Sequence, residues 1–237
     1  MVCVESDDRT LYYDGQTYHK PSSRDQYESK LKCIGHFTTL ESFFDTFATL
    51  HRPSQMGRNT NYHLFKAGIK PMWEDPANAN GGRWVLTLRE QSSTAGARAA
   101  HEALLDRSWM WLVFGFIGEH FDEDNHVTGA VCSLRTKGDR IALWLREKEP
   151  VETVNALGEK FLRLLELENV PNIQLEFSTN DGSKGHYMTV RNAPKPKQDP
   201  VSVEEEPALN QWLDSEFTLH PTDHAWYYAH HTQGKET

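Results

Sequence analysis

Two runs of alternating apolar residues, 127–135 and 140–146, are separated only by the tetrapeptide TKGD. A connection this short that contains a glycine predicts an antiparallel β-hairpin. Further strand-like stretches lie at 11–13, 61–66, 83–90, 173–177 and 186–190. Helical patterns interrupt these strands without the strand–helix–strand alternation that parallel sheets show. The sequence therefore predicts an α+β fold in which an antiparallel sheet carries helices on one face.

Three helices are expected. The first begins at a capping box formed by Thr38 and Glu41 and ends before Pro53. Its apolar stripe consists of Leu40, Phe43, Phe44, Phe47 and Leu50. The second runs from about residue 99 to 121 and contains WMWLVFGFI, which is apolar on all sides. Such a helix is either deeply buried or keeps one side for a partner. The third helix begins at Pro150.

Length and charge exclude several classes of protein. A chain of 237 residues fits one domain with extensions, and it can bury a stable core without disulfides or structural metal ions. The formal net charge of -9 argues against a broad, nonspecific nucleic-acid binder, so any such contact must be local. No apolar run reaches membrane-spanning length. The three cysteines lack metal or disulfide spacing, which indicates a reducing compartment and a cytoplasmic protein.

The segment KPMWEDPANANGGRW, residues 70–84, places a Trp-Glu-Asp run between a proline and two glycines. These neighbours predict a loop. An indole on a loop beside a carboxylate suits a flat, electron-poor ligand, because the ring can stack and the carboxylate can accept N–H groups. The alternative is that Trp73 covers a core while Glu74 and Asp75 only shape a turn.

Basic residues gather at the tip of the predicted hairpin. Arg135, Lys137 and Arg140 lie there, and Trp144 follows on the second strand. Such a cluster is usually just solvated, but it could hold phosphates that a mainly acidic protein otherwise repels. Upstream, Tyr27 lies at the end of a polar stretch that reads as a loop; by itself it could be structural or inert.

The composition changes after about residue 192, where KPKQDP and VSVEEEP indicate a linker rich in proline and glutamate. An aromatic tail follows, with Trp212, Trp226 and neighbouring tyrosines. His220 and His224 are four residues apart, but Pro221 breaks the helix that would align them. No metal site is expected there.

Three stretches, YHLFKAGIKPMWEDPANANGGRW, GAVCSLRTKGDRIALW and IGHFTTLESFF, resemble the translation initiation factor 4E family, which binds the 5′ cap of mRNA. The resemblance covers roughly residues 12–190. It implies a curved antiparallel sheet with three helices on its convex face and the cap in its concave face. It divides the chain into an N-terminal extension (1–10), a cap-binding domain (11–191) and a linker with an aromatic tail (192–237). It also implies that the protein has no cofactor and no enzymatic activity.

The resemblance assigns a role to each candidate residue. In the family, 7-methylguanine is held between two aromatic rings, which match Trp73 and Tyr27. Glu74 matches the carboxylate that accepts the N–H groups of the base, and Trp144 matches the residue beside the methyl group. The phosphates of a 7-methylguanosine triphosphate cap would be held by Arg83, Arg135, Lys137 and Arg140.

The sequence departs from the family at three informative positions. Tyr27 stands where the main initiation factors have tryptophan, which resembles the 4E-homologous-protein branch associated with repression of translation. The surface that docks a partner's short helix aligns with Leu40, Phe44, Met110, Trp111 and Phe114. Phe44 replaces a usual tryptophan there, and Trp111 replaces an acidic residue of the main factors. These changes put the ordinary mode of partner binding in doubt.

The leading hypothesis is therefore a monomeric cap-binding protein, without a membrane association, that regulates translation as a repressor-type homologue. Its protein partners would be 4E-binding proteins or an initiation scaffold. The alternative within the family is an active initiation factor. An enzyme with a metal held by Glu74, Asp75 or residues 122–124 lacks any nucleophile–base pair. A scaffold that has lost cap binding conflicts with the presence of Trp73 and Glu74.

Overall fold

A computed structural model describes residues 8–15, 24–90, 92–121 and 125–192. The predicted linker, the aromatic tail with its histidines, and the acidic turn at 122–124 lie outside these residues. In the described part of the chain, no helix combines the length and apolar character that a membrane crossing requires.

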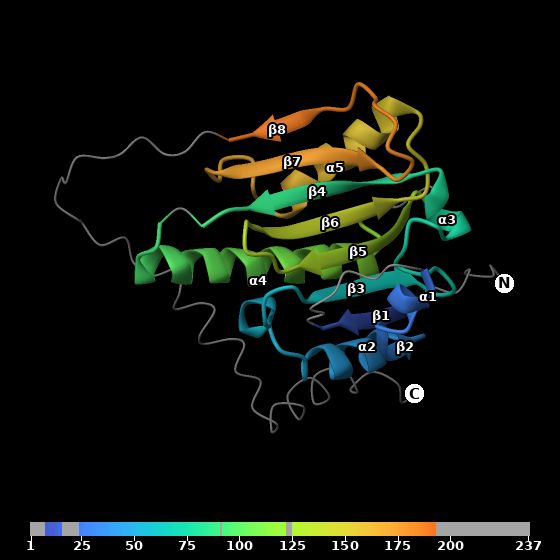
Figure 1. Cartoon of the computed structure of the whole chain (residues 1–237), viewed down its shortest axis with the longest axis horizontal. Helices are drawn as coiled ribbons and strands as arrows, with labels where there is room; N and C mark the ends of the chain where they lie inside the picture. Colours follow the sequence, from blue (N-terminus) through green and yellow to red (C-terminus); the bar gives the residue numbers. More distant parts are fainter. Residues whose placement is uncertain (1–7, 16–23, 91, 122–124, 193–237) are drawn as a thin grey trace, which may run out of the picture. The chain divides into compact units, whose positions relative to one another are not determined.

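The described residues form one eight-stranded sheet in the order β2-β1-β3-β5-β6-β4-β7-β8, in which every pair of neighbours is antiparallel (Figure 1). The strands are β1 (Arg9–Asp14), β2 (Lys32–Phe37), β3 (Asn61–Lys66), β4 (Gly82–Leu88), β5 (Val127–Ser133), β6 (Asp139–Leu145), β7 (Ile173–Thr179) and β8 (Thr189–Arg191). The hairpin predicted from residues 127–146 is present as β5 and β6. The predicted antiparallel α+β fold is confirmed.

Strand β2 has no counterpart among the strands expected from the sequence. It lies at one edge of the sheet, and most of its residues are exposed or half-buried, so its sequence lacks an apolar face. Its pairing with β1 is also irregular, because the register shifts between Leu11 and Tyr12. A strand with one neighbour and a bulge leaves little periodic signal.

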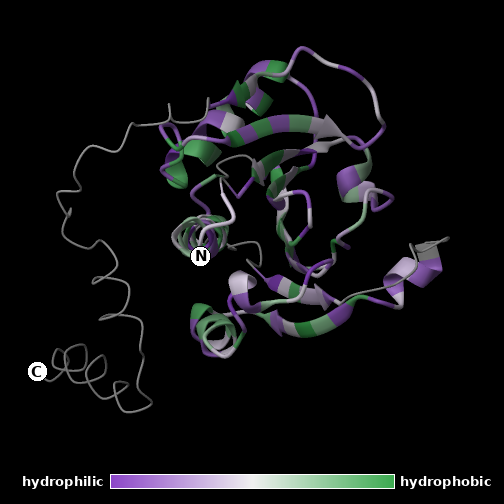
Figure 2. Ribbon diagram, turned by 60° about the vertical axis from the view of Figure 1, so that its left-hand side comes forward, coloured by the Kyte–Doolittle hydropathy of each residue, from purple (hydrophilic) through white to green (hydrophobic). Residues whose placement is uncertain are grey.

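Three helices, α2 (Leu40–Phe47), α4 (Ala95–Ile117) and α5 (Val151–Leu164), cover one face of the sheet, as expected (Figure 2). We call this helix-covered face convex and the opposite face concave. Two short helices, α1 (Arg24–Glu28) and α3 (Pro76–Ala79), and a 3-10 turn, η1 (Pro53–Gln55), complete the elements of the described residues.

Four predicted helix boundaries are wrong, since both α2 and α4 differ from the expectation at their two ends, and α2 already ends at Phe47. The N-cap of α2 is Thr39 and not Thr38, because the Thr39 hydroxyl accepts the N–H of Ser42. Helix α4 starts four residues before the expected position, since Thr94 caps it by accepting the N–H of Ala97 at 3.3 Å. It ends at Ile117, before the capping residue Gly118. The first turns of α4 contain alanines and a glycine without apolar periodicity, so the start of the helix could not be predicted from the pattern.

The two faces of the sheet have separate apolar clusters. The large core lies between the sheet and the convex helices, and it includes Tyr62 and Leu64 from β3. The smaller cluster contains Phe65, Ile69, Val131, Ala142 and Trp144. Because successive residues of a strand point to opposite faces, β3 contributes to both clusters. The small cluster forms an apolar floor on the concave face, and the candidate site is built beside it.

Candidate functional site

The Trp73 loop, residues 70–81, is held in shape by two of its own side chains. The Asp75 carboxylate accepts the backbone N–H groups of Lys70 and Ala77, each at 2.9 Å. The Asn78 amide donates to the carbonyls of Lys70 and Met72 at 3.0 and 2.9 Å. Both side chains are buried. Together with the short helix α3, these hydrogen bonds give the loop a defined shape.

This loop displays Trp73 instead of burying it. The indole is 57% exposed, whereas the preceding Met72 is buried. The alternative that Trp73 covers a core is therefore wrong. The two carboxylates also separate in role: Asp75 caps α3, while the half-buried Glu74 carboxylate has no hydrogen bond or ion pair with any described residue. Glu74 is thus available to accept N–H groups from a ligand.

Tyr27 lies on α1 and not in a loop, and it approaches the Trp73 loop. Its hydroxyl donates to the carbonyl of Pro71 at 3.2 Å, and the next residue, Glu28, forms a 2.8 Å ion pair with Lys70. Burial raises the pKa of the Tyr27 phenol, and the charges of Asp14 and Glu74 raise it further. The structure thus places Tyr27 against the Trp73 loop, within range of the charge of Glu74.

Three guanidinium groups gather on the same side of the sheet. The Arg83 guanidinium lies over the Trp144 ring at 4.9 Å from its centroid. Burial lowers the pKa values of both Arg83 and Arg135, and the charge of Arg140 lowers each of them further. Positive charge gathered in this way, in a protein with net charge -9, suits an anion. Lys137 is exposed in the turn between β5 and β6.

Trp144 lies beneath this group of arginines. It is buried in the small cluster, edge-on to Phe65 at a centroid distance of 5.6 Å. Its indole N–H is buried and has no hydrogen-bond partner among the described residues. A buried donor without a partner is uncommon, and a bound ligand is one way to satisfy it.

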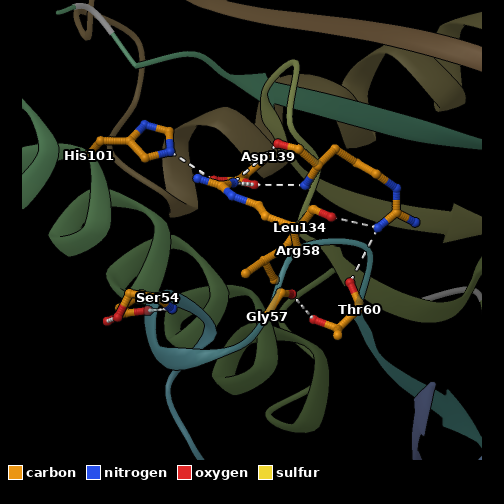
Figure 3. A network of polar contacts seen from close by, with 9 residues as sticks. Ser54, Gly57, Arg58, Thr60, His101, Leu134 and Asp139 are labelled. Carbon is orange, nitrogen blue, oxygen red and sulfur yellow. Dashed lines mark hydrogen bonds and ion pairs between the residues drawn. The ribbon is translucent and has the colours of Figure 1, made fainter. Parts of the chain in front are cut away.

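A buried carboxylate that the sequence reasoning did not find supports the basic hairpin. Asp139, 2% exposed, accepts the backbone N–H of Arg135 at 2.9 Å and the Arg58 guanidinium at 2.7 Å. Its other oxygen lies 2.8 Å from Nε2 of His101 on α4. Figure 3 shows Arg58 and His101 reaching Asp139 from different segments. Although burial raises the pKa of Asp139, hydrogen bonds from His101, Arg135 and Arg58 hold it below its ordinary value.

On the convex face, the five residues expected to dock a partner lie on α2 and α4. Leu40, Phe44 and Trp111 are 55%, 39% and 39% exposed. The Phe114 ring contacts both Phe44 and Trp111, with centroid distances of 5.5 and 6.4 Å. Met110, next to Trp111, is half-buried. We call these five residues the convex patch.

An exposed indole, an unengaged carboxylate and a group of guanidinium ions suit a flat ligand that carries phosphates. No group of His, Cys, Asp and Glu in the described ranges could hold a metal ion. The fold and the site together have the features of a protein module that binds such a ligand.

Comparison with known proteins gives the family. The family model of Eukaryotic initiation factor 4E matches residues 7–194. A Zea mays isoform 4E-2 is 33% identical over 175 residues, covering 74% of this chain and 73% of the relative. Caenorhabditis elegans initiation factor 4E-4 is 31% identical over 197 residues, covering 81% and 86%. The chain belongs to the eukaryotic initiation factor 4E family, which consists of translation factors and not of enzymes.

Comparison with solved structures gives the same family. C. elegans eIF4E-3, in complex with the 4E-binding protein Mextli, superimposes with a TM-score of 0.66 at 29% identity, covering 77% of this chain and 96% of that one. Ascaris suum eIF4E-3, in complex with the m7G cap, gives a TM-score of 0.64 at 32% identity, with 77% and 94% coverage.

Proposed function

We propose that the concave face binds the 7-methylguanosine cap of mRNA through the site described above. The observation that carries the proposal is that features of separate segments converge: exposed Trp73 and unengaged Glu74 in one loop, Tyr27 on α1, and the arginines of β4 and the β5–β6 hairpin. The complex of A. suum eIF4E-3 with the m7G cap supports the assignment.

In this proposal, Trp73 and Tyr27 stack on the two faces of the base. Methylation gives the base a positive charge, so stacking gains a cation–π contribution that unmethylated guanine lacks. The Glu74 carboxylate accepts two N–H groups from the base edge, which are charge-assisted hydrogen bonds. Trp144 contributes its buried edge near the methyl group.

The phosphates are held by Arg83, Arg135, Lys137 and Arg140. Arg135 uses three of its N–H donors on the carbonyls of Thr60 and Leu134 and on Asn61, which leaves two of its five for a phosphate. Phosphate contacts of this kind are screened by salt. Arg135→Ala and Lys137→Ala should therefore weaken binding of a triphosphate cap analogue more than that of a monophosphate analogue.

The convex patch is proposed to dock the short helical motif of a 4E-binding protein or of an initiation scaffold. The complex of C. elegans eIF4E-3 with Mextli supports the class of partner. Exposed large aromatic side chains that contact one another form the kind of apolar surface that an amphipathic helix covers.

The finer proposal is that the protein is a repressor-type homologue rather than an active initiation factor. Its support is Tyr27 at a stacking position where the main factors have tryptophan, together with Trp111 in the convex patch. Tethering the protein to a reporter mRNA distinguishes the two: a repressor lowers the translation of the reporter, and an initiation factor raises it.

The cap proposal is tested by titration with 7-methylguanosine triphosphate and with GTP. The wild-type protein should bind the methylated ligand more tightly, and Trp73→Ala should remove most of that affinity while the protein stays folded, because the indole is exposed. Trp111→Ala, on the opposite face, should leave the affinity intact. Equal affinity of the wild-type protein for both nucleotides would contradict the proposal.

A further inference from the structure

Two side chains from neighbouring strands and one from the segment after β5 form a polar chain on the concave face. Asp14 ends β1 and is the cross-strand partner of Asn61, which begins β3. Asn61 in turn pairs with Ser133, two residues before Arg135. The Asn61 side-chain N–H donates to the Asp14 carboxylate, and the Asn61 carbonyl oxygen accepts Nη2–H of Arg135 at 2.6 Å.

The direction of these hydrogen bonds is fixed by chemistry. A guanidinium can only donate and an ionised carboxylate can only accept. Between them, the Asn61 amide must turn its oxygen toward Arg135 and its nitrogen toward Asp14. The carboxylate therefore selects one of the two orientations of the amide, and the amide presents an acceptor to the arginine.

Asp14 is held in the ionised state that this arrangement needs. Burial raises its pKa, but His63, Asn61 and Arg135 outweigh that effect and hold the pKa below its ordinary value. The imidazole Nε2 of His63 lies 3.4 Å from the carboxylate. Asn61 is only 8% exposed, so little water competes for its hydrogen bonds.

The remaining contacts of Arg135 make the Asn61 bond decisive for its orientation. Nη1 donates to the carbonyls of Leu134 at 2.8 Å and Thr60 at 3.3 Å, both beside the root of the side chain. Nη2 has one protein partner among the described residues, and that partner is Asn61. Without it, the guanidinium is held only through Nη1, and its Nη2 side loses its protein partner among the described residues.

We propose that the Asp14–Asn61 pair positions the Arg135 guanidinium for the phosphates of the cap. The inference rests on the proposed cap-binding function and adds two positioning residues to it. By charge alone, an acidic residue beside a phosphate site weakens binding. The geometry assigns Asp14 the opposite effect, because a fixed guanidinium loses less freedom when it binds a phosphate.

Four variants test this assignment, each titrated with mono- and triphosphate cap analogues. Asp14→Ala frees the amide and should weaken triphosphate binding about five-fold, while monophosphate binding changes by less than about two-fold. Asn61→Leu should behave in the same way. Asp14→Asn keeps an oxygen that accepts the Asn61 N–H, so affinity should stay within about two-fold of wild type.

The fourth variant reverses the pair. In the double variant Asp14→Asn/Asn61→Asp, the amide at position 14 donates to the carboxylate at position 61, which accepts from Arg135. Net charge is unchanged, and triphosphate affinity should return to within about two-fold of wild type. Asp45→Ala, which removes an exposed carboxylate from α2, is the matched control for loss of one negative charge.

Three results would overturn the inference. The first is an unchanged or higher affinity of Asp14→Ala for the triphosphate analogue, because Asp14 would then act only through its charge. Another is an equal loss for both analogues, which indicates general damage. The third is a double variant that stays as weak as Asp14→Ala.

A measurement without ligand separates this inference from the cap proposal. Side-chain NMR of Arg135 should show restricted rotation of the guanidinium in the free wild-type protein and faster rotation in Asp14→Ala. If the protein binds no cap, the proposed function is refuted. If rotation is nevertheless restricted in that protein, the effect of the pair on Arg135 still holds. Equal rotation in both proteins would refute the pair.

Discussion

The two aromatic sides of the proposed cap site are built by different means. The Trp73 loop is held by buried Asp75 and Asn78, which make four hydrogen bonds within the loop. The Tyr27 side is a helix of five residues, and its contacts with the loop include one phenol hydrogen bond and one ion pair. The difference shows that the backbone that carries Trp73 is fixed by hydrogen bonds of its own loop, whereas Tyr27 is held by side-chain contacts with that loop.

The largest effect is expected from the base-recognition carboxylate on the fixed side. Glu74→Gln replaces an acceptor with an amide whose N–H groups face those of the base, so binding should weaken by roughly 2–4 kcal/mol. Titration with a methylated cap analogue measures the loss. Thermal unfolding is the control and should not change, since Glu74 supports no described hydrogen bond or ion pair. Unchanged cap affinity would remove Glu74 from the site.

A smaller loss is expected from the support of the fixed side. Asp75→Ala leaves the N–H groups of Lys70 and Ala77 without an acceptor inside a buried loop, which should lower the free energy of unfolding by about 1–3 kcal/mol. Cap affinity should fall with it, because Trp73 is no longer held. Denaturant unfolding and cap titration measure the two effects. If stability falls and affinity does not, the fixed position of Trp73 is irrelevant to binding.

On the Tyr27 side, the expected change is an improvement. Indole offers a larger and more negative face to a cation than phenol does, so Tyr27→Trp should tighten methylated cap binding by about 0.5–1 kcal/mol. The gain should largely vanish for GTP, which lacks the charged base. Tyr27→Ala should weaken binding clearly. If Tyr27→Ala binds the cap as well as wild type, Tyr27 is not a stacking residue.

The smallest effect concerns the ion pair that joins the two sides. Lys70→Gln removes one partner of Glu28, and an exposed pair of this kind contributes about 0.2–1 kcal/mol. Cap affinity should fall by that amount at low salt and become equal to wild type at high salt, because the wild-type pair is itself screened. A salt-independent loss would indicate that Lys70 acts by other means. Lys66→Gln, at the end of β3, is the matched control.

The sequence predicted the parts of this site that are local in the chain. The Trp-Glu-Asp loop and the basic hairpin lie within short segments whose turn residues set their conformation. The contact of Tyr27 with Pro71 could not be predicted from periodicity, since it joins residues 44 apart. The same holds for Asp14 and Asn61, which meet only through the pairing of β1 with β3. The strand register decides which polar side chains become neighbours, and a single sequence does not state that register.

The buried carboxylate of Asp139 was missed for a related reason. Its position after a glycine reads as an ordinary turn aspartate, and its partners Arg58 and His101 lie 81 and 38 residues away. The convex patch was easier to predict. The resemblance to the family and the all-round apolar helix both pointed to it, and Phe44 and Trp111 are exposed.

The three attachments of Asp139 have a consequence for local unfolding. One carboxylate holds the turn of the β5–β6 hairpin, the segment after η1 and the first half of α4. Opening any one of these segments removes a hydrogen bond from a buried carboxylate and so weakens the attachment of the other two. They should therefore open together, and their amide protons should exchange with deuterated solvent at a common rate. The arginine-bearing hairpin and the helix that carries Trp111 then belong to one cooperative unit, although they serve opposite faces of the sheet.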